Sequence, residues 1–363
     1  MNFEELKEIV NINSGTKNSK GVNKVGNYLL EKILEIDKFE IQRFSKNDDR
    51  VGDLIWIKSN KIDNKPNILF CGHIDTVFEE TSSFQKFDED DTTVYGPAVS
   101  DMKGGLIIML NALRELKKEV GNIFNIDILL VPDEETGSQN YRQEMLEIYK
   151  NYKYGLVFEP TGEPNTLIDK RKGAYFVTVE SFGKAGHSGY YSWDYTNAID
   201  VMNKVIEDVS KLRNQEKDTS INFGFIKGGE KANIVADYAK LIFDIRAWDN
   251  SEFERVVNGL KKIEEKYDGK IKIKIDKLFS AFENKNSVKL RETILKVNKN
   301  IKFVSRKGGS DASGMSSAGI QTIDGFGSVG DNFHNNKEFA YKKYFEEKIN
   351  LTKEVVIELL KKK

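Results

Sequence analysis

The chain has 363 residues, of which 39% are hydrophobic and 31% charged, as is typical of a soluble globular protein large enough for two domains. Its 56 basic and 57 acidic residues nearly cancel, so no net charge favours a nucleic acid or an anionic membrane as a partner. A single cysteine, Cys71, excludes an internal disulfide, and no apolar stretch approaches the roughly 20 residues of a membrane helix. Together with an N-terminus unlike a signal peptide, these features predict a cytoplasmic protein.

The first part of the chain alternates short apolar strands with helical patterns. Strands are expected at 53–58, 67–72, 125–131 and 154–158, and a helix at 105–119. The runs at 67–72 and 125–131 are almost continuously apolar, which is typical of strands covered on both faces. Strand–helix–strand order therefore predicts an α/β fold with a mostly parallel sheet flanked by helices. Ligands of such sheets bind beyond the carboxyl ends of the strands.

A different pattern begins near Arg171. Its elements follow the order β-α-β-β-α-β and are expected at 174–183, 198–212, 220–229, 239–248, 253–263 and 270–279. This is the order of a ferredoxin-like α+β domain. Helix at 287–300, strand at 320–326 and a final helix then resume the first pattern. The sequence thus predicts one α/β domain, formed by 1–171 and 284–363, that is interrupted by an inserted α+β domain at 172–283.

Three consecutive carboxylates, Asp133, Glu134 and Glu135, follow the predicted strand at 125–131. An acidic run is usually a solvated loop, but here its context indicates a site. His73 and Asp75 follow another core strand, and side chains two residues apart on extended backbone point to the same face. A carboxylate beside a histidine is typical of a metal ligand whose tautomer is fixed by a second residue.

Five potential metal ligands are expected at one edge of the sheet: His73, Asp101, Glu135, Glu159 and His334. Two histidines and three carboxylates suit two zinc-like ions if one carboxylate bridges them. Glu134 is then left over beside a ligand. Such a carboxylate can act as the general base that takes a proton from water and passes it to a leaving nitrogen.

With these residues placed, the sequence resembles the di-zinc exopeptidases and amidohydrolases that include carboxypeptidase G, aminoacylase, acetylornithine deacetylase and succinyl-diaminopimelate desuccinylase. The resemblance covers nearly the whole chain. It is carried by "GHIDTV" (72–77), "YGPAVSDMKGG" (95–105), "PDEETGS" (132–138), "FEPT" (158–161), "GKAGHSG" (183–189) and the late His334. One departure lies in the second motif, where Ala98 stands at a position that is commonly glycine in the family.

The resemblance implies a particular ligand arrangement. Asp101 would bridge two divalent ions, His73 and Glu159 would bind one of them, and Glu135 and His334 would bind the other. The ions would be zinc, although cobalt and manganese can occupy such ligand sets.

The resemblance also implies further roles. Asp75 would orient the ligand histidine, and Glu134 would be the general base. The inserted domain would be a lid through which the protein also forms a homodimer. On it, His187 would stabilise the oxyanion from its own or the partner's subunit, and Asn233 and Arg246 would hold the substrate. An arginine suits a carboxylate, which it grips with two parallel hydrogen bonds.

The predicted activity is hydrolysis of an amide bond next to a free carboxylate. A carboxypeptidase G-like metallopeptidase acting on short peptides or acyl-glutamate substrates is the first choice, and an N-acyl-amino-acid deacylase is the alternative. The chemistry of the two is the same, and the sequence leaves the substrate side chain and acyl group open.

Two other interpretations compete with this one. The segment "GGSDA" at 308–312 faintly resembles the turn of a serine nucleophile, although it lacks the full G-x-S-x-G pattern. A metal chelator would separate the two, because a serine hydrolase would keep its activity. The chain could also be a metal-binding or scaffolding protein without activity. Retention of Glu134 speaks against that, because this residue is not needed as a ligand.

Overall fold

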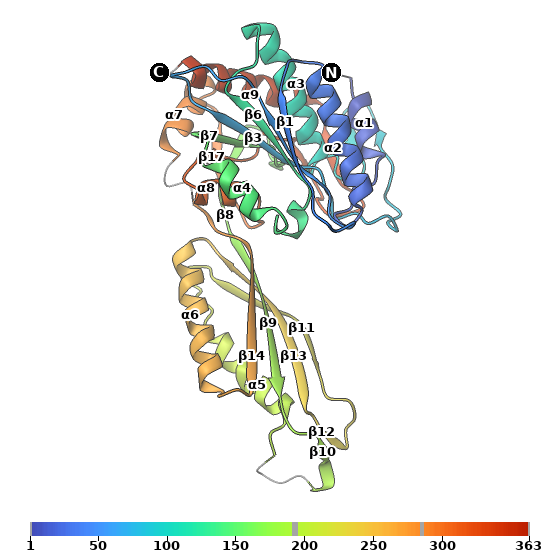
Figure 1. Ribbon diagram of the computed structural model, residues 1–363, viewed down its shortest axis with the longest axis vertical. Helices are drawn as coiled ribbons and strands as arrows, with labels where there is room; N and C mark the ends of the chain where they lie inside the picture. The colour runs from blue at the N-terminus through green and yellow to red at the C-terminus, as the bar shows by residue number, and fades with distance from the viewer. Residues whose placement is uncertain (1, 191–194, 284–286, 362–363) are drawn as a thin grey trace. The chain divides into compact units, whose positions relative to one another are not determined.

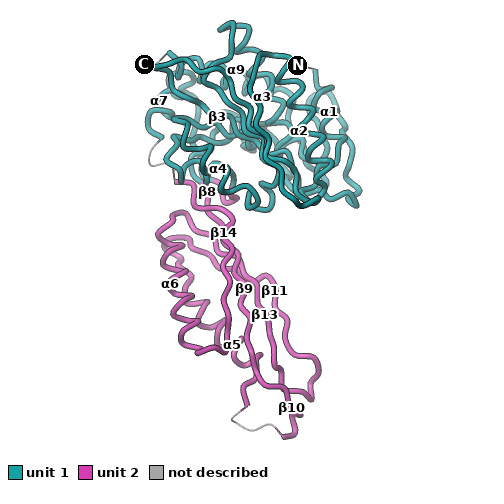
Figure 2. Tube along the Cα trace, in the orientation of Figure 1, with its two compact units in different colours: residues 1–170, 284–305, 310–363 teal, residues 171–283, 306–309 magenta. Residues whose placement is uncertain are grey.

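The computed structural model describes residues 2–190, 195–283 and 287–361, and the chain divides into two compact units (Figure 2). Unit 1 comprises residues 1–170, 284–305 and 310–363, and unit 2 comprises 171–283 and 306–309. The predicted boundary at residue 284 lies outside the described residues. In the described part of the chain, no helix has both the length and the apolar character needed to cross a bilayer.

A six-stranded sheet forms the centre of unit 1 (Figure 1). Its strands are, in spatial order, β1 (Glu40–Phe44), β2 (Leu54–Lys58), β6 (Ile126–Val131), β3 (Ile68–His73), β7 (Tyr154–Val157) and β17 (Gln321–Ile323). Strands β6, β3, β7 and β17 run parallel, whereas β1 and β2 are antiparallel additions at one edge. Every residue of β3 and β6 is buried, as their continuous apolar sequence predicted.

In the described part of unit 1, these helices accompany the sheet: α1 (Glu4–Val10), α2 (Ser19–Leu34), α3 (Lys103–Val120), α4 (Arg142–Tyr149), α7 (Val288–Val297), α8 (Ala312–Ser317) and α9 (Lys343–Lys361). Helix α3 packs against α1, α2, α9 and strand β3, and α8 packs against β7 and β17. The apolar stripe of α3, which includes Leu106, Leu110 and Leu113, is fully buried in the main core. The predicted α/β class with a mostly parallel sheet and flanking helices is confirmed.

Short strands and one turn of 3-10 helix complete unit 1. A small sheet has the order β18 (Gly330–Asp331), β19 (Phe339–Tyr341), β5 (Thr93–Tyr95) and β4 (Asp88–Glu89), and β8 (Thr166–Arg171) pairs with β16 (Lys302–Arg306). The 3-10 turn η1 (Glu134–Thr136) follows β6.

Unit 2 is built on a four-stranded antiparallel sheet with the order β11 (Ser220–Gly228), β13 (Tyr238–Ala247), β9 (Gly173–Phe182) and β14 (Ile271–Phe279). Helices α5 (Ala198–Ser210) and α6 (Asn250–Lys266) bury their apolar sides against it. Short elements complete the unit: β10 (Gly186–His187), β12 (Ile234–Val235), β15 (Phe282–Glu283) and η2 (Ser188–Tyr190). The order β-α-β-β-α-β is that of the predicted ferredoxin-like insertion.

Candidate active site

The carboxyl ends of the parallel strands carry the predicted site residues. His73 is the last residue of β3, and its register partner in β6 is Val131. Glu134 opens η1 three residues after that partner, and Glu159 follows β7, which ends at Val157. Parallel pairing of β3 with β6 and β7 therefore brings these three side chains together at the carboxyl ends of the central strands.

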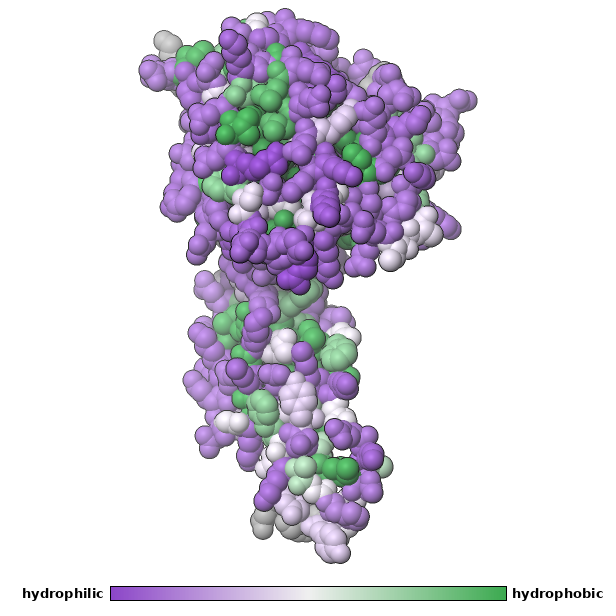
Figure 3. Space-filling model, turned by 45° about the vertical axis from the view of Figure 1, so that its right-hand side comes forward, coloured by the Kyte–Doolittle hydropathy of each residue, from purple (hydrophilic) through white to green (hydrophobic). Residues whose placement is uncertain are grey.

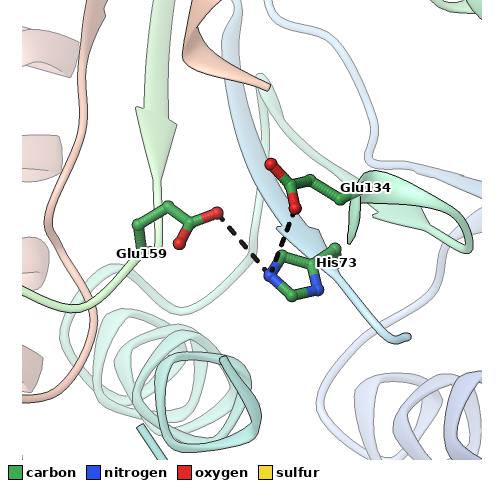
Figure 4. Close-up of side chains that lie close together, drawn as sticks. All are labelled: His73, Glu134 and Glu159. Carbon is green, nitrogen blue, oxygen red and sulfur yellow. Dashed lines mark ion pairs between the residues drawn. The ribbon is translucent and has the colours of Figure 1, made fainter. Parts of the chain in front are cut away.

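The imidazole of His73 is buried and faces carboxylates with one nitrogen. Its Nε2 lies 3.6 Å from Oε1 of Glu159 and 3.9 Å from Oε2 of Glu134 (Figure 4). The same nitrogen lies 3.1 Å from Oδ1 of Asp101. The other ring nitrogen, Nδ1, lies 3.0 Å from the backbone oxygen of Asp75. When Nδ1–H donates to that oxygen, Nε2 keeps a lone pair directed at the carboxylates, as a metal ligand requires.

A second cluster forms around His334. Its Nε2 lies 3.2 Å from Oδ2 of Asp101 and 3.3 Å from Oε2 of Glu135. Asp101 thus directs one carboxylate oxygen at each histidine, which is the arrangement of a bridging ligand. Ligand atoms of His73, Asp101 and Glu135 also lie within 4.8 Å of one another. The structure therefore brings all five predicted metal ligands together around one shared carboxylate.

Glu134 lies close enough to His73 and Glu159 to be considered as a metal ligand as well as a general base. Ligand atoms of Glu134, His73 and Glu159 lie within 4.8 Å of one another, so geometry alone would also permit Glu134 as a ligand. The side chain of Glu134 is buried and comes from η1 next to Glu135. Its role as general base remains a prediction.

The electrostatics of the site fit a pair of bound cations. Burial raises the pKa of Glu134 well above its usual value, and the charge of His73 opposes this only in part. Hydrogen bonds with Asp101 and Glu135 raise the pKa of His334 to about 11. Within the described part of the chain, Oε1 of Glu135 is buried without a hydrogen-bond partner. Divalent ions would neutralise these carboxylates and give that oxygen a partner, so the donor set suits zinc-type ions.

The three consecutive carboxylates after β6 divide into separate tasks. Asp133 is buried and accepts hydrogen bonds from the backbone N–H and side-chain amide of Asn140, so it holds the loop. Glu134 faces His73, and Glu135 faces His334. Gly137 ends η1 with φ +91°, a left-handed conformation that glycine adopts without strain.

Asp75 contacts both His73 and the backbone of the 3-10 turn η1. Its Oδ1 lies 3.3 Å from Nδ1 of His73 and accepts the backbone N–H of Glu134 at 3.1 Å. Its Oδ2 accepts the backbone N–H of Glu135 at 3.3 Å and the hydroxyl of Thr16 at 2.6 Å. Sequence reasoning assigned Asp75 to the histidine alone and missed Thr16, whose only signal was its place in a polar Ser–Gly–Thr turn after a helix.

The Asp75→Asn variant tests this shared support. An amide cannot accept all of these hydrogen bonds, so we expect a loss of about 10- to 100-fold in metal affinity or in kcat/KM. The measurement is metal content after dialysis together with initial rates. Thr16→Val is the matched comparison, because it removes one hydroxyl from the same carboxylate and should cost less. An Asp75→Asn protein with normal metal affinity and normal rates would contradict this role.

Three predicted residues lie in unit 2, where two of them are neighbours and the third lies apart. His187 is exposed, and its Nδ1 accepts the backbone N–H of Gly189 at 3.0 Å. The backbone oxygen of Asn233 accepts from Ser188, so Asn233 and His187 are neighbours. Arg246 lies on β13, where its Nε donates to Asp244 at 2.8 Å.

The distance of Arg246 from this pair follows from strand register. Arg246 pairs with Ala174 at one end of β9, and Tyr238 pairs with Phe182 at the other end, where the chain leaves for His187. Eight residues of extended strand span about 26 Å, so Arg246 and His187 lie far apart within unit 2.

The segment 308–312 does not carry a serine nucleophile. The Ser310 side chain is fully buried and donates to Oδ2 of Asp324 at 2.8 Å. Asp311 accepts from the hydroxyl of Ser138 at 2.5 Å, and burial raises the pKa of Asp311 to about 7. Ser310 is thus held by a carboxylate and not by a histidine, which a serine nucleophile needs as its base.

Histidines and carboxylates gathered at the carboxyl ends of parallel strands form the kind of donor set that metal-dependent hydrolases use. The chain belongs to the family described as Peptidase family M20/M25/M40, whose model matches residues 69–358. The resemblance stated from the sequence motifs is thereby confirmed.

Two relatives and one solved structure illustrate the family. Carboxypeptidase G2 of Pseudomonas sp. (strain RS-16) is 29% identical over 263 residues, which cover 72% of this chain but only 63% of that relative. Succinyl-diaminopimelate desuccinylase of Rickettsia typhi (strain ATCC VR-144 / Wilmington) is 28% identical over 261 residues, covering 66% of this chain and 67% of the relative. The structure of aminopeptidase PepT from Bacillus cereus ATCC 10987 matches the fold with a TM-score of 0.78 at 20% identity, over 98% of this chain and 97% of that one.

Proposed function

We propose that the protein is a zinc-dependent hydrolase that cleaves an amide bond next to a free carboxylate, as a carboxypeptidase G-like metallopeptidase. The observation that carries this proposal is Asp101, which directs one oxygen at His73 and the other at His334. A carboxylate shared in this way suits two ions, each completed by one histidine and one further carboxylate. His73 and Glu159 would hold one ion, and Glu135 and His334 the other.

The remaining side chains provide the proton transfers. Bound divalent ions would supply Lewis-acid polarisation of the scissile carbonyl and would make a water molecule easier to deprotonate. Glu134 lies beside His73 and Glu159 and directly precedes Glu135, and it would accept the proton of the attacking water and deliver it to the leaving nitrogen. Its burial keeps competing solvent away from the carboxylate. Asp75 would hold His73 and the backbone of η1 in place throughout.

Substrate recognition is assigned to unit 2. Arg246 carries the guanidinium that would bind the free carboxylate of a short peptide or an acyl-glutamate, with Asp244 holding its Nε. The carboxypeptidase G2 relative supports a peptidase, and the desuccinylase relative, at nearly the same identity, supports the alternative of an N-acyl-amino-acid deacylase.

A homodimer through unit 2 is also part of the proposal. Strand β11 lies at the edge of its sheet and exposes Phe225 and Ile226, at 47% and 61% of their surface. Figure 3 shows hydrophobic side chains gathered on the surface of this unit. An apolar edge strand is a template for pairing with a second chain. Because His187 and Arg246 are separated by the length of β9, the pair that would complete one site would come from two subunits.

The buried Cys71 fits the proposed cytoplasmic location.

A hydrolysis screen tests the proposed function. The purified protein would be assayed with dipeptides, N-acetyl amino acids and folyl- or benzoyl-glutamate, and its metal content would be counted. We expect about two metal ions per chain and highest kcat/KM on a substrate with a free carboxylate beside the cleaved bond. Preference for an N-acetyl amino acid would establish the deacylase instead. A protein that binds no metal and cleaves nothing would refute the assignment.

A further inference from the structure

Glu338 is a buried carboxylate that lies four residues after His334 and is not among the predicted ligands. Its side chain is fully buried. Oε1 accepts the backbone N–H groups of Ser100 and Asp101, each at 2.9 Å, and Oε2 accepts that of Ala98 at 3.2 Å. A single carboxylate thus takes three N–H donors from the four residues that end at the bridging Asp101.

The loop that Glu338 binds has an unusual backbone. Ala98 has φ +60°, in the left-handed region that side chains other than glycine rarely adopt. The turn directs three amides toward one side, and such concave sets of N–H groups bind anions. Buried N–H groups must find partners, so the carboxylate of Glu338 satisfies donors that the bent loop cannot pair internally.

The contact also joins two parts of the site that are distant in sequence. Asp101 directs Oδ1 at His73 and Oδ2 at His334, so a small rotation of its backbone would misplace both oxygens. Glu338 fixes that backbone from the segment that carries His334. Unlike Glu135, whose Oε1 lacks a partner in the described chain, Glu338 has both oxygens engaged by amides.

We propose that Glu338 is a positioning residue for the bridging carboxylate, and that it sets the affinity for both ions by holding the backbone of residues 98–101. This inference rests on the proposed metal-dependent function. It predicts that Glu338 acts only through Asp101 and makes no contact with an ion or substrate of its own.

The experiment is a double-mutant cycle on metal binding. Metal-free wild type, Glu338→Gln, Asp101→Asn and the double variant would be titrated with Co²⁺, whose absorption spectrum reports ligand geometry. We expect Glu338→Gln to weaken Co²⁺ binding by about 10- to 100-fold and to alter the spectrum. In the Asp101→Asn background, Glu338→Gln should cost little more, because the two residues act in series.

Two further variants separate positioning from folding. Asp127→Asn neutralises another buried carboxylate, one that accepts the backbone N–H of Ser59 away from the site, and it should destabilise the protein without changing Co²⁺ affinity. Glu338→Asp keeps the charge but shortens the reach, and it should bind Co²⁺ with an affinity between those of wild type and Glu338→Gln. Wild-type affinity and spectrum in Glu338→Gln would overturn the inference and leave the proposed function standing. A wild-type protein that binds no Co²⁺ would instead overturn the proposed function, and the inference with it.

Discussion

The Glu134→Gln variant is expected to lose about 10²- to 10⁴-fold in kcat, the usual contribution of a general acid–base residue. The amide cannot accept a proton from water, whereas its size and its position on η1 next to Glu135 are unchanged. KM should change little, because the substrate carboxylate is assigned to Arg246. Single-turnover and steady-state rates on the best substrate of the hydrolysis screen provide the measurement.

Metal content decides what such a loss means. Glu134 lies 3.9 Å from Nε2 of His73, so a ligand role is the competing explanation. We expect Glu134→Gln to keep about two ions per chain, which would leave proton transfer as its task. Glu144→Gln is the control. Glu144 lies on α4 of the same unit, where it pairs with Lys46, so this variant should keep full activity. An inactive Glu134→Gln protein that has lost one ion would reassign Glu134 as a ligand.

Removal of the metal ions should have the other large effect. After dialysis against a chelator, activity is expected to fall by about three orders of magnitude or more, because several kcal/mol of transition-state stabilisation leave with the ions. The midpoint of thermal unfolding should also fall, since the ions bind the folded chain only. Adding back Zn²⁺, Co²⁺ or Mn²⁺ to separate samples should restore activity and identify the metal that supports the highest rate.

The same experiment tests the competing hydrolase. A serine mechanism would survive chelation, and it would be lost in Ser310→Ala. We expect chelation to abolish the activity, because Ser310 is buried against Asp324 and has no histidine as its base. Full activity in metal-free protein would therefore contradict the site described around Asp101.

The sequence sufficed to predict that these candidate ligands meet, because strand order and parallel pairing determine which side chains lie together at the carboxyl ends of the strands. His73, Glu134 and Glu159 each follow an apolar run, and such runs are read directly from composition and spacing. His334 had no such strand to mark it, and its prediction rested on its being the only late histidine and on the family resemblance. The residue patterns alone did not show that β2 would pair antiparallel with β6, or that β1 would in turn pair antiparallel with β2.

The supporting contacts could not be predicted in the same way. Thr16 reaches Asp75 across 59 residues of sequence, and Glu338 reaches Asp101 across 237. Neither residue lies on an element whose periodicity points at the site. Glu338 accepts from backbone amides and Thr16 donates a hydroxyl to Asp75, and both kinds of group occur in any loop. Such contacts depend on how the loops pack, and only the folded chain specifies that.

The two units divide the proposed work in a way that bears on how this protein can change over generations. All five predicted ligands, Asp75, Glu134 and Glu338 belong to unit 1, whereas His187, Asn233 and Arg246 belong to unit 2. On the proposed assignment, mutations in unit 2 can alter which acyl group or side chain is accepted while the proposed metal site stays intact. A duplicated copy could drift from one substrate to another through the insertion alone, without passing through an ancestor that had lost its catalyst.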